Sequence, residues 1–141
     1  MDFSQVVVLT LMVIATSGHR RYMDLVPNGH NVLNPCDGTP WLGLGHTNPQ
    51  GGGPRSKFGE DFAAAGHTWT VALCQTDSDG DGKTNGFELG DHNCTWHEGD
   101  GTGDLMPVQG HPGICEPLNL CPDSWFTCLP VATGAPDPIG K

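Results

Sequence analysis

Apolar residues are concentrated in two parts of this chain, one near the N-terminus and one in the middle. Residues 6–15 are almost wholly apolar, a run too short to span a bilayer as a helix. Small residues follow at Ala15, Ser17 and Gly18, as they do at a signal-peptidase site. We therefore predict a secretory signal peptide over residues 1–17, cut after Ser17 or Gly18, and no membrane-spanning segment.

The second apolar pattern has the period of an α-helix. Its residues recur at intervals of three, four or one positions and fall on one stripe about 100° wide. They are Phe58, Phe62, Ala65, Trp69, Ala72 and Leu73. Ser56 is placed to cap the N-terminus, and Gly66 inside the pattern predicts the close approach of a neighbouring backbone. The pattern predicts one amphipathic helix whose aromatic residues, together with Trp41, pack in the core.

This helix leads into an acidic segment, residues 77–88, with the ligand spacing of an EF-hand calcium loop. Oxygen-bearing side chains stand at positions 1, 3, 5, 9 and 12 of the segment, and glycine stands at position 6. Crowded carboxylates repel one another, and a bound hard cation reverses that repulsion. The sequence predicts Ca²⁺ as the cofactor. The predicted metal ligands are Asp77, Asp79, Asp81, Lys83 through its main-chain carbonyl, Asn85 and Glu88.

A short exit helix is predicted to follow at residues 85–89, ended by Gly90. No second loop of this kind follows, which favours a single structural ion in calcium-rich extracellular fluid over a cytosolic calcium sensor.

The cysteine content points to the same compartment. An even number of cysteines in a short exported chain predicts three disulfides, with 15 possible connectivities. They are Cys36, Cys74, Cys94, Cys115, Cys121 and Cys128. Because 21 glycines and 12 prolines leave a thin core, the disulfides and the ion should compensate.

We therefore predict a small, disulfide-rich, loop-dominated α+β protein. Residues 18–96 form the calcium-binding domain, and residues 97–141 form a Gly/Pro-rich, cysteine-bearing C-terminal tail. The formal net charge of −10 argues against nucleic acid or an anionic membrane surface as a partner.

The sequence leaves two further sites open. Asn93-Cys94-Thr95 is a formal N-glycosylation sequon, although its middle residue is expected to be bridged. If the signal peptide is cut after Gly18, His19 becomes the mature N-terminus, and an amino-terminal histidine can chelate copper with a second histidine. His46, beside Asn48, is the other histidine considered as a ligand. No catalytic motif supports an enzyme otherwise.

Many short motifs occur in one order along residues 22–96 and resemble the temptin family. They are Val26-Pro27-Asn28-Gly29, Asn34-Pro35-Cys36, Gly43-Leu44-Gly45-His46, Gly51-Gly52-Gly53, Phe58 to Gly66, Trp69-Thr70, Leu73-Cys74 and Asp77 to Cys94, with His111 to Cys115 beyond them. Temptins are secreted proteins of the water-borne mating pheromone complex in marine gastropods.

This resemblance implies a pheromone or pheromone-accessory role that is exerted with partner proteins such as attractin-like peptides. It also implies a Cys74–Cys94 disulfide across the acidic loop. Cys36 would then join a C-terminal cysteine, with Cys115 as first choice, which leaves Cys121 with Cys128.

The function expected from the sequence is that of a secreted, calcium-binding, disulfide-stabilised binding protein, not an enzyme, that acts as an attraction or mating signal. The alternatives are a copper-dependent oxidase using His19 or His46, and a calcium-binding extracellular-matrix protein. The sequence identifies neither the partner nor the receptor.

Overall fold

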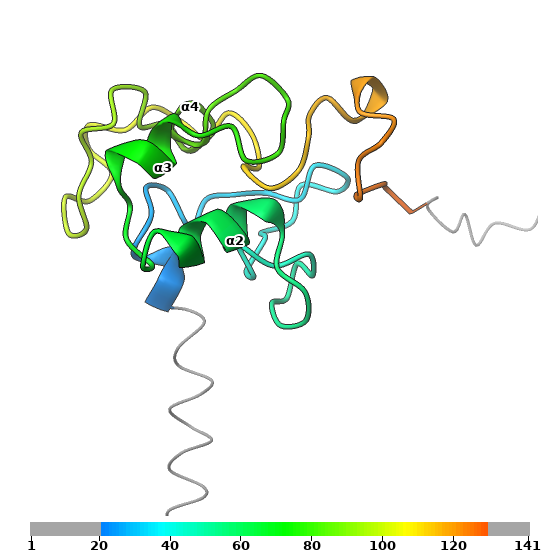
Figure 1. The fold of residues 1–141 in the computed structure, drawn as a ribbon, viewed down its shortest axis with the longest axis horizontal. Helices are drawn as coiled ribbons and strands as arrows, with labels where there is room; N and C mark the ends of the chain where they lie inside the picture. The colour runs from blue at the N-terminus through cyan, green and yellow to red at the C-terminus, as the bar shows by residue number, and fades with distance from the viewer. Residues whose placement is uncertain (1–20, 130–141) are drawn as a thin grey trace, which may run out of the picture.

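Loops and turns make up most of the computed structural model, which describes residues 21–129 (Figure 1). The helices are α2 (Lys57–Ala64), α3 (Val71–Gln75) and α4 (Asn85–Leu89), with a 3-10 turn, η1 (Leu118–Leu120). Residues 21–23 are also helical. In place of strands, this part of the chain has two isolated bridges, Leu33 with Pro40 and His46 with Arg55. The β part of the predicted α+β class is reduced to these bridges. The predicted signal peptide lies outside the described residues.

The predicted single amphipathic helix is wrong, because the structure divides it into α2 and α3. Ser56 caps α2 as predicted, its Oγ accepting from the Gly59 N–H. The helix then ends because Gly66 and His67 take positive φ angles of 71° and 55°, and Thr70 caps a new helix through the Leu73 N–H at 3.0 Å. No atom lies within 4 Å of a Cβ built on Gly66. This glycine therefore makes a turn, and the close backbone approach predicted for it is absent.

The core is assembled from widely separated parts of the chain. The aromatic residues predicted for it are all buried. Ile114 is completely buried in the same core, and Val108 and Phe126 pack against this core from its edge, where they are partly buried. The boundary placed at residue 97 is therefore not a packing boundary, because the Gly/Pro-rich segment supplies single apolar residues that no periodic pattern reveals. The core residues are Val26, Val32, Trp41, Phe58, Phe62, Trp69, Leu73, Cys74, Leu89 and Ile114.

Three disulfides include all six cysteines. Cys74–Cys94 is present as the resemblance implied. The other two pairs differ from the implied ones, since Cys36 bonds Cys128 and Cys115 bonds Cys121. Cys115 and Cys121 are six residues apart, and their bond encloses η1. The Cys36–Cys128 bond joins the end of the described chain to the segment of residues 28–38.

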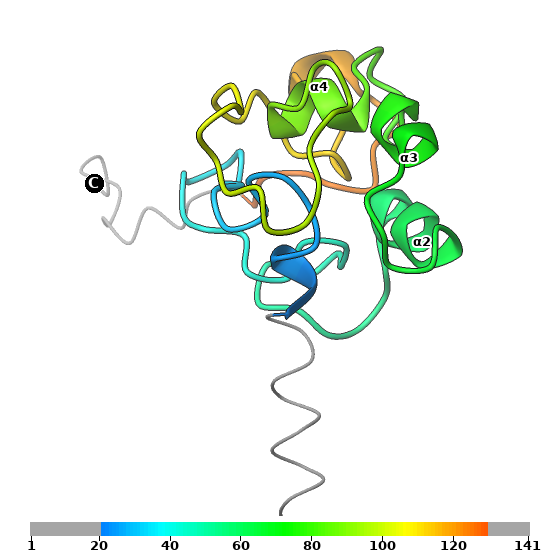
Figure 2. The ribbon, with the colours of Figure 1, turned by 90° about the vertical axis from the view of Figure 1, so that its left-hand side faces the viewer.

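α2 and α3 lie on one side of the molecule, with α4 above them, and loops form the opposite side (Figure 2). α3 and α4 pack against each other, and the acidic segment connects them. Within residues 21–129, no helix is both long and apolar enough to cross a membrane.

Candidate metal centre

The acidic segment is held as a tight loop by its own first aspartate. Asp77 Oδ1 accepts hydrogen bonds from the N–H groups of Gly80 at 2.9 Å and Asp81 at 3.2 Å. Asp77 Oδ2 accepts a third from Gly82 at 2.8 Å. Gly82, the glycine at loop position 6, has a φ of 87°, a conformation that a residue with a Cβ rarely adopts. The loop then enters α4, which Thr84 caps and Gly90 ends in the left-handed conformation, as predicted.

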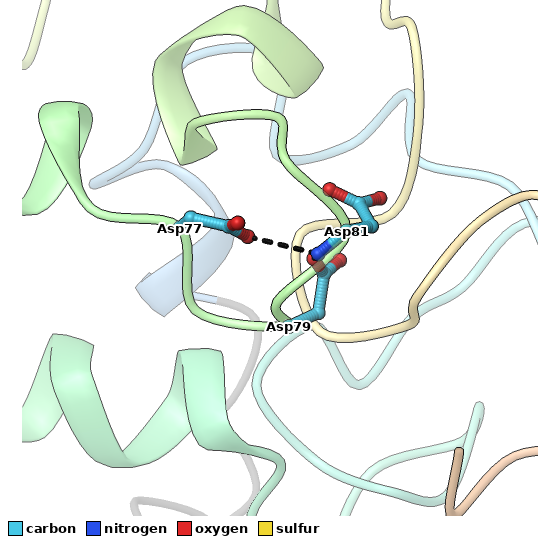
Figure 3. A group of neighbouring side chains, drawn as sticks. All are labelled: Asp77, Asp79 and Asp81. Carbon is cyan, nitrogen blue, oxygen red and sulfur yellow. Dashed lines mark hydrogen bonds between the residues drawn. The ribbon is translucent and has the colours of Figure 1, made fainter. Parts of the chain in front are cut away.

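Three of the predicted ligands are brought together at this loop. Asp77, Asp79 and Asp81 each offer a carboxylate oxygen, and the three oxygens lie within 4.8 Å of one another. Figure 3 shows the three side chains turned toward a common region, with the hydrogen bond from the Asp81 N–H to Asp77. It is the one such group of acidic, histidine or cysteine side chains found among residues 21–129.

Glu88, the predicted twelfth-position ligand, is buried beside these aspartates without a hydrogen-bond donor. It is 0% exposed, and neither Oε1 nor Oε2 has a partner among the described residues. Asp79 Oδ2 and Asn85 Oδ1 are buried without a donor in the same way. Since buried polar atoms are nearly always hydrogen-bonded, four unpaired acceptor oxygens in one loop require a physical explanation.

The electrostatics of the loop are unfavourable in the absence of a cation. Burial, followed by the charges of Asp79 and Asp81, raises the pKa of Glu88 to about 11. Burial and the charge of Asp81 raise the pKa of Asp79 to about 8. Each carboxyl therefore holds its proton in the folded protein at a pH where the unfolded chain has lost it. Without a cation, the stability contributed by these groups falls as the pH rises above their ordinary pKa values.

The donor set fits a hard divalent cation. All four unpaired atoms are oxygens of carboxylate or amide groups, which are the ligands that calcium and magnesium prefer. A cation at this position would offset the repulsion among the carboxylates and give the buried oxygens a partner. The chain itself offers no such partner within its described residues.

The remaining predicted ligands have distinct surroundings. Asn85 Nδ2 donates to the Leu73 carbonyl and to Ser78 Oγ, both at 2.9 Å, which fixes the amide and leaves its Oδ1 as the unpaired atom. The Lys83 side chain does not lie free, because its Nζ donates to the Glu116 carbonyl at 3.2 Å. His46 is not part of the acidic group, and its Nδ1 lies 3.3 Å from the Gly53 carbonyl. His19 lies outside the described residues.

Sequence reasoning missed the contacts between the acidic loop and residues 105–116. Figure 3 shows the pale yellow ribbon of this segment passing beside the aspartates. The Glu116 N–H donates to Asp81 Oδ2 at 3.3 Å, and the Gln109 N–H donates to the Glu88 carbonyl at 2.7 Å. A Cβ built on Gly110 would lie 3.2 Å from Glu88 Oε1. No local pattern signals these contacts, because they join residues more than twenty positions apart.

Sequence reasoning also missed Asp91, which is a second buried carboxylate close to Glu88 in the sequence. Asp91 is 4% exposed and accepts hydrogen bonds from Trp69 Nε1 at 2.9 Å and from the N–H groups of Thr95 and Trp96. It lies next to the Cys74–Cys94 disulfide, with Cys74 Sγ 3.4 Å from its carbonyl oxygen. Asp91 therefore anchors the chain that leaves α4.

These features define a small, loop-dominated, disulfide-bridged protein with an acidic loop in which three aspartates lie close together. A family model described as Temptin C-terminal matches residues 16–114, and the chain belongs to this temptin family. Temptin of Aplysia californica is 44% identical over 114 residues, which cover 80% of this chain and 90% of that protein. No solved structure matches the chain.

Proposed function

We propose that this protein is secreted, binds calcium at the acidic loop, and serves as a component of a water-borne protein pheromone that acts with other secreted proteins or attractin-like peptides. Membership of the temptin family supports the signalling role. Three disulfides and no free cysteine support an extracellular location, because thiols stay reduced in the cytosol.

The observation that carries the calcium proposal is the state of Glu88, which is fully buried with both oxygens unpaired next to Asp79 and Asp81. Asp77, Asp79, Asp81, Asn85 and Glu88 would hold the ion, with the Lys83 carbonyl as a further ligand. When bound, the ion supplies positive charge among these carboxylates.

The protein's own residues would then transmit the effect of the ion. Glu88 belongs to α4, and its carbonyl holds Gln109. Asp81 holds the backbone of Glu116. An ordered acidic loop therefore keeps residues 105–116 in place against the core, and the protein presents a fixed surface to its partners. Binding, with no chemical step, is the mechanism.

Calorimetric titration of the chelator-treated protein with CaCl₂ tests the calcium proposal. We expect one bound ion and an increase in the melting temperature. Saturation at 100 times the dissociation constant adds about 2.7 kcal/mol to the free energy of unfolding. Glu88→Gln should abolish the response, whereas Glu98→Gln, which alters an exposed carboxylate outside the loop, should retain it. No heat of binding and an unchanged melting temperature would refute the proposal.

The signalling role needs a separate experiment. The tagged protein, incubated with the secretion of the source tissue in calcium, should retain secreted proteins or peptides that are released by a chelator. Glu88→Gln should retain less, and the released material should restore attraction in a behavioural assay. Metal analysis of the purified protein distinguishes the alternatives, since stoichiometric copper with an N-terminal His19 would favour an oxidase.

A further inference from the structure

A cavity of about 570 Å³ lies between two segments that are distant in sequence, residues 28–38 and residues 107–116. Leu33, Pro35 and Val108 give it apolar walls, and Asn31, Asn34 and Glu116 give it polar groups. Asn28 and His111 also line it. The volume lies within the range of about 300–1,000 Å³ for small-molecule sites, in which apolar walls are combined with polar groups that orient the ligand.

The charges around the cavity select the kind of ligand. None of the residues that line it is a lysine or an arginine, and the ionisable ones are His111 and Glu116. His111 is 1% exposed, and burial lowers its pKa to about 3, so its ring is neutral. Glu116 is the other ionisable group. Burial raises the pKa of its carboxyl, whereas the hydrogen bond from the His111 N–H and the charge of Lys83 favour its ionised form. The cavity therefore offers an anion no positive partner.

Glu116 is held in place by its surroundings and keeps capacity for a further donor. Its Oε1 accepts from the His111 N–H at 2.7 Å, its N–H donates to Asp81, and its carbonyl accepts from Lys83 Nζ. Lys83 is not among the residues that line the cavity. The carboxylate is thus presented on a fixed backbone, and a second oxygen is left to accept from a ligand. The overall charge of −10 also attracts cations at long range.

We infer that this cavity binds an ammonium group carried on an apolar stem, with the stem against Leu33, Pro35 and Val108 and the nitrogen at Glu116. Two sources present this chemistry, a free organic amine and a lysine side chain of a partner peptide. None of the residues that line the cavity belongs to the predicted ligand set, so the inference is tested separately from the calcium proposal. Asp81 and Lys83 nevertheless hold Glu116 in place, and the test is therefore made in calcium.

Three probes that share a phenylbutyl stem test the inference on the full-length mature protein in calcium. They are 4-phenylbutylammonium, 4-phenylbutanol and 5-phenylpentanoate. Two-dimensional NMR gives each dissociation constant. We expect the ammonium to bind about tenfold or more tightly than the carboxylate, with shifts at residues 31–35 and 107–116. Glu116→Gln should weaken the ammonium about fivefold or more and leave the alcohol unchanged.

Two further variants guard against a folding artefact. Leu33→Lys places a positive charge at a half-exposed position of the wall and should weaken the ammonium while strengthening the carboxylate. Glu98→Gln, an exposed carboxylate that does not line this cavity, should change neither. Equal binding of ammonium and carboxylate, no binding of either, or the same loss in both glutamate variants would overturn the inference.

A lysine peptide and its ε-acetylated form distinguish the two sources. Displacement of 4-phenylbutylammonium by the lysine form alone assigns the ammonium to a partner protein. Binding of the free amine without competition by either peptide assigns it to a small molecule.

Discussion

Two buried carboxylates three residues apart, Glu88 and Asp91, have opposite surroundings. Asp91 follows α4 and accepts hydrogen bonds from an indole N–H and two main-chain N–H groups. Glu88 belongs to α4 and accepts none, although it is the more deeply buried of the two. Burial alone therefore does not define the role of a carboxylate, because Asp91 has hydrogen-bond donors within the fold and Glu88 has none among the described residues.

Under the calcium proposal, this difference distinguishes a structural carboxylate, Asp91, from a metal ligand, Glu88. Three donors satisfy the oxygens of Asp91 inside the fold. A buried carboxylate whose nearest charges are other carboxylates is stable only when protonated or when paired with a cation. The unpaired oxygens of Asp79 and Asn85 beside Glu88 make a shared cation the simpler of these solutions at neutral pH.

Removal of the Asp91 carboxylate should cause the largest loss of stability. Asp91→Ala leaves the Trp69 indole and two main-chain N–H groups without an acceptor, and we expect a loss of about 3–5 kcal/mol in the free energy of unfolding. Urea denaturation monitored by tryptophan fluorescence measures this. The loss should be the same in calcium and in chelator, because Asp91 does not belong to the proposed ligand set.

Asp91→Asn is the matched control, because its amide oxygen still accepts while the charge is removed. We expect it to lose less than the alanine variant. A calcium-dependent loss in either variant would mean that Asp91 also serves the metal site, and the distinction between the two carboxylates would fail.

Glu88→Gln should have an effect whose sign depends on calcium. With calcium at 100 times the dissociation constant, the variant loses about 2.7 kcal/mol of ion-dependent stabilisation. In chelator, it should be as stable as the unchanged protein or more stable, because glutamine removes an acid whose ionisation is unfavourable at that position. Thermal unfolding of both proteins in both conditions gives the comparison.

Asp104→Asn, at an exposed acid away from the loop, should leave both melting temperatures nearly unchanged. A Glu88→Gln variant that is destabilised equally in calcium and in chelator would show that Glu88 has a purely structural role, like that of Asp91.

The acidic loop could be predicted from the sequence because its information is local. Spacing alone indicates that Asp77, Asp79 and Asp81 converge, and the structure brings these three together. The short exit helix and its end at Gly90 follow from local propensity for the same reason. Periodicity also identified Phe58, Phe62, Trp69 and Leu73 as buried, although Ala72 of the same stripe is exposed. It missed the break at Gly66, because a glycine inside a periodic pattern gives no sign of its φ angle.

Features that depend on contacts between distant segments could not be predicted. The hydrogen bond from Trp69 to Asp91, the Cys36–Cys128 pairing and the packing of Ile114 join parts of the chain that no local pattern connects. A glycine- and proline-rich segment such as residues 97–116 has no period to interpret. Its contribution to the core is decided by tertiary packing alone.

His111 is a buried basic side chain, and its burial affects stability in the opposite direction of pH from the burial of Glu88. Its Nδ1 accepts from the Gly113 N–H at 3.0 Å, and burial lowers its pKa from 6.5 to about 3. Between these values the unfolded chain binds one proton more than the folded protein, so stability falls as the pH falls, by about 1.4 kcal/mol per pH unit.

His111→Asn keeps an acceptor for Gly113 and cannot titrate, so this part of the pH dependence should disappear. Urea denaturation of both proteins at pH 6, 5 and 4 gives the two slopes. Parallel slopes would mean that His111 is protonated in the folded protein, which contradicts its burial as a neutral ring.

The smallest expected effect tests how far the influence of the ion site extends. Lys83→Met keeps the apolar stem and removes the hydrogen bond to the Glu116 carbonyl, at a cost of about 0.5–1.5 kcal/mol. In hydrogen exchange, calcium should slow the main-chain amides of residues 109–116 in the unchanged protein, because Gln109 and Glu116 donate to Glu88 and Asp81.

The Lys83→Met variant should lose part of that slowing at residues 109–116 and none at residues 94–96, which Asp91 holds independently of the ion. Arg55→Met, which removes an exposed cation elsewhere, should behave like the unchanged protein. If calcium slows exchange equally at residues 94–96 and 109–116, the two carboxylates belong to one cooperative unit, and Glu88 and Asp91 differ only in their donors and not in what they control.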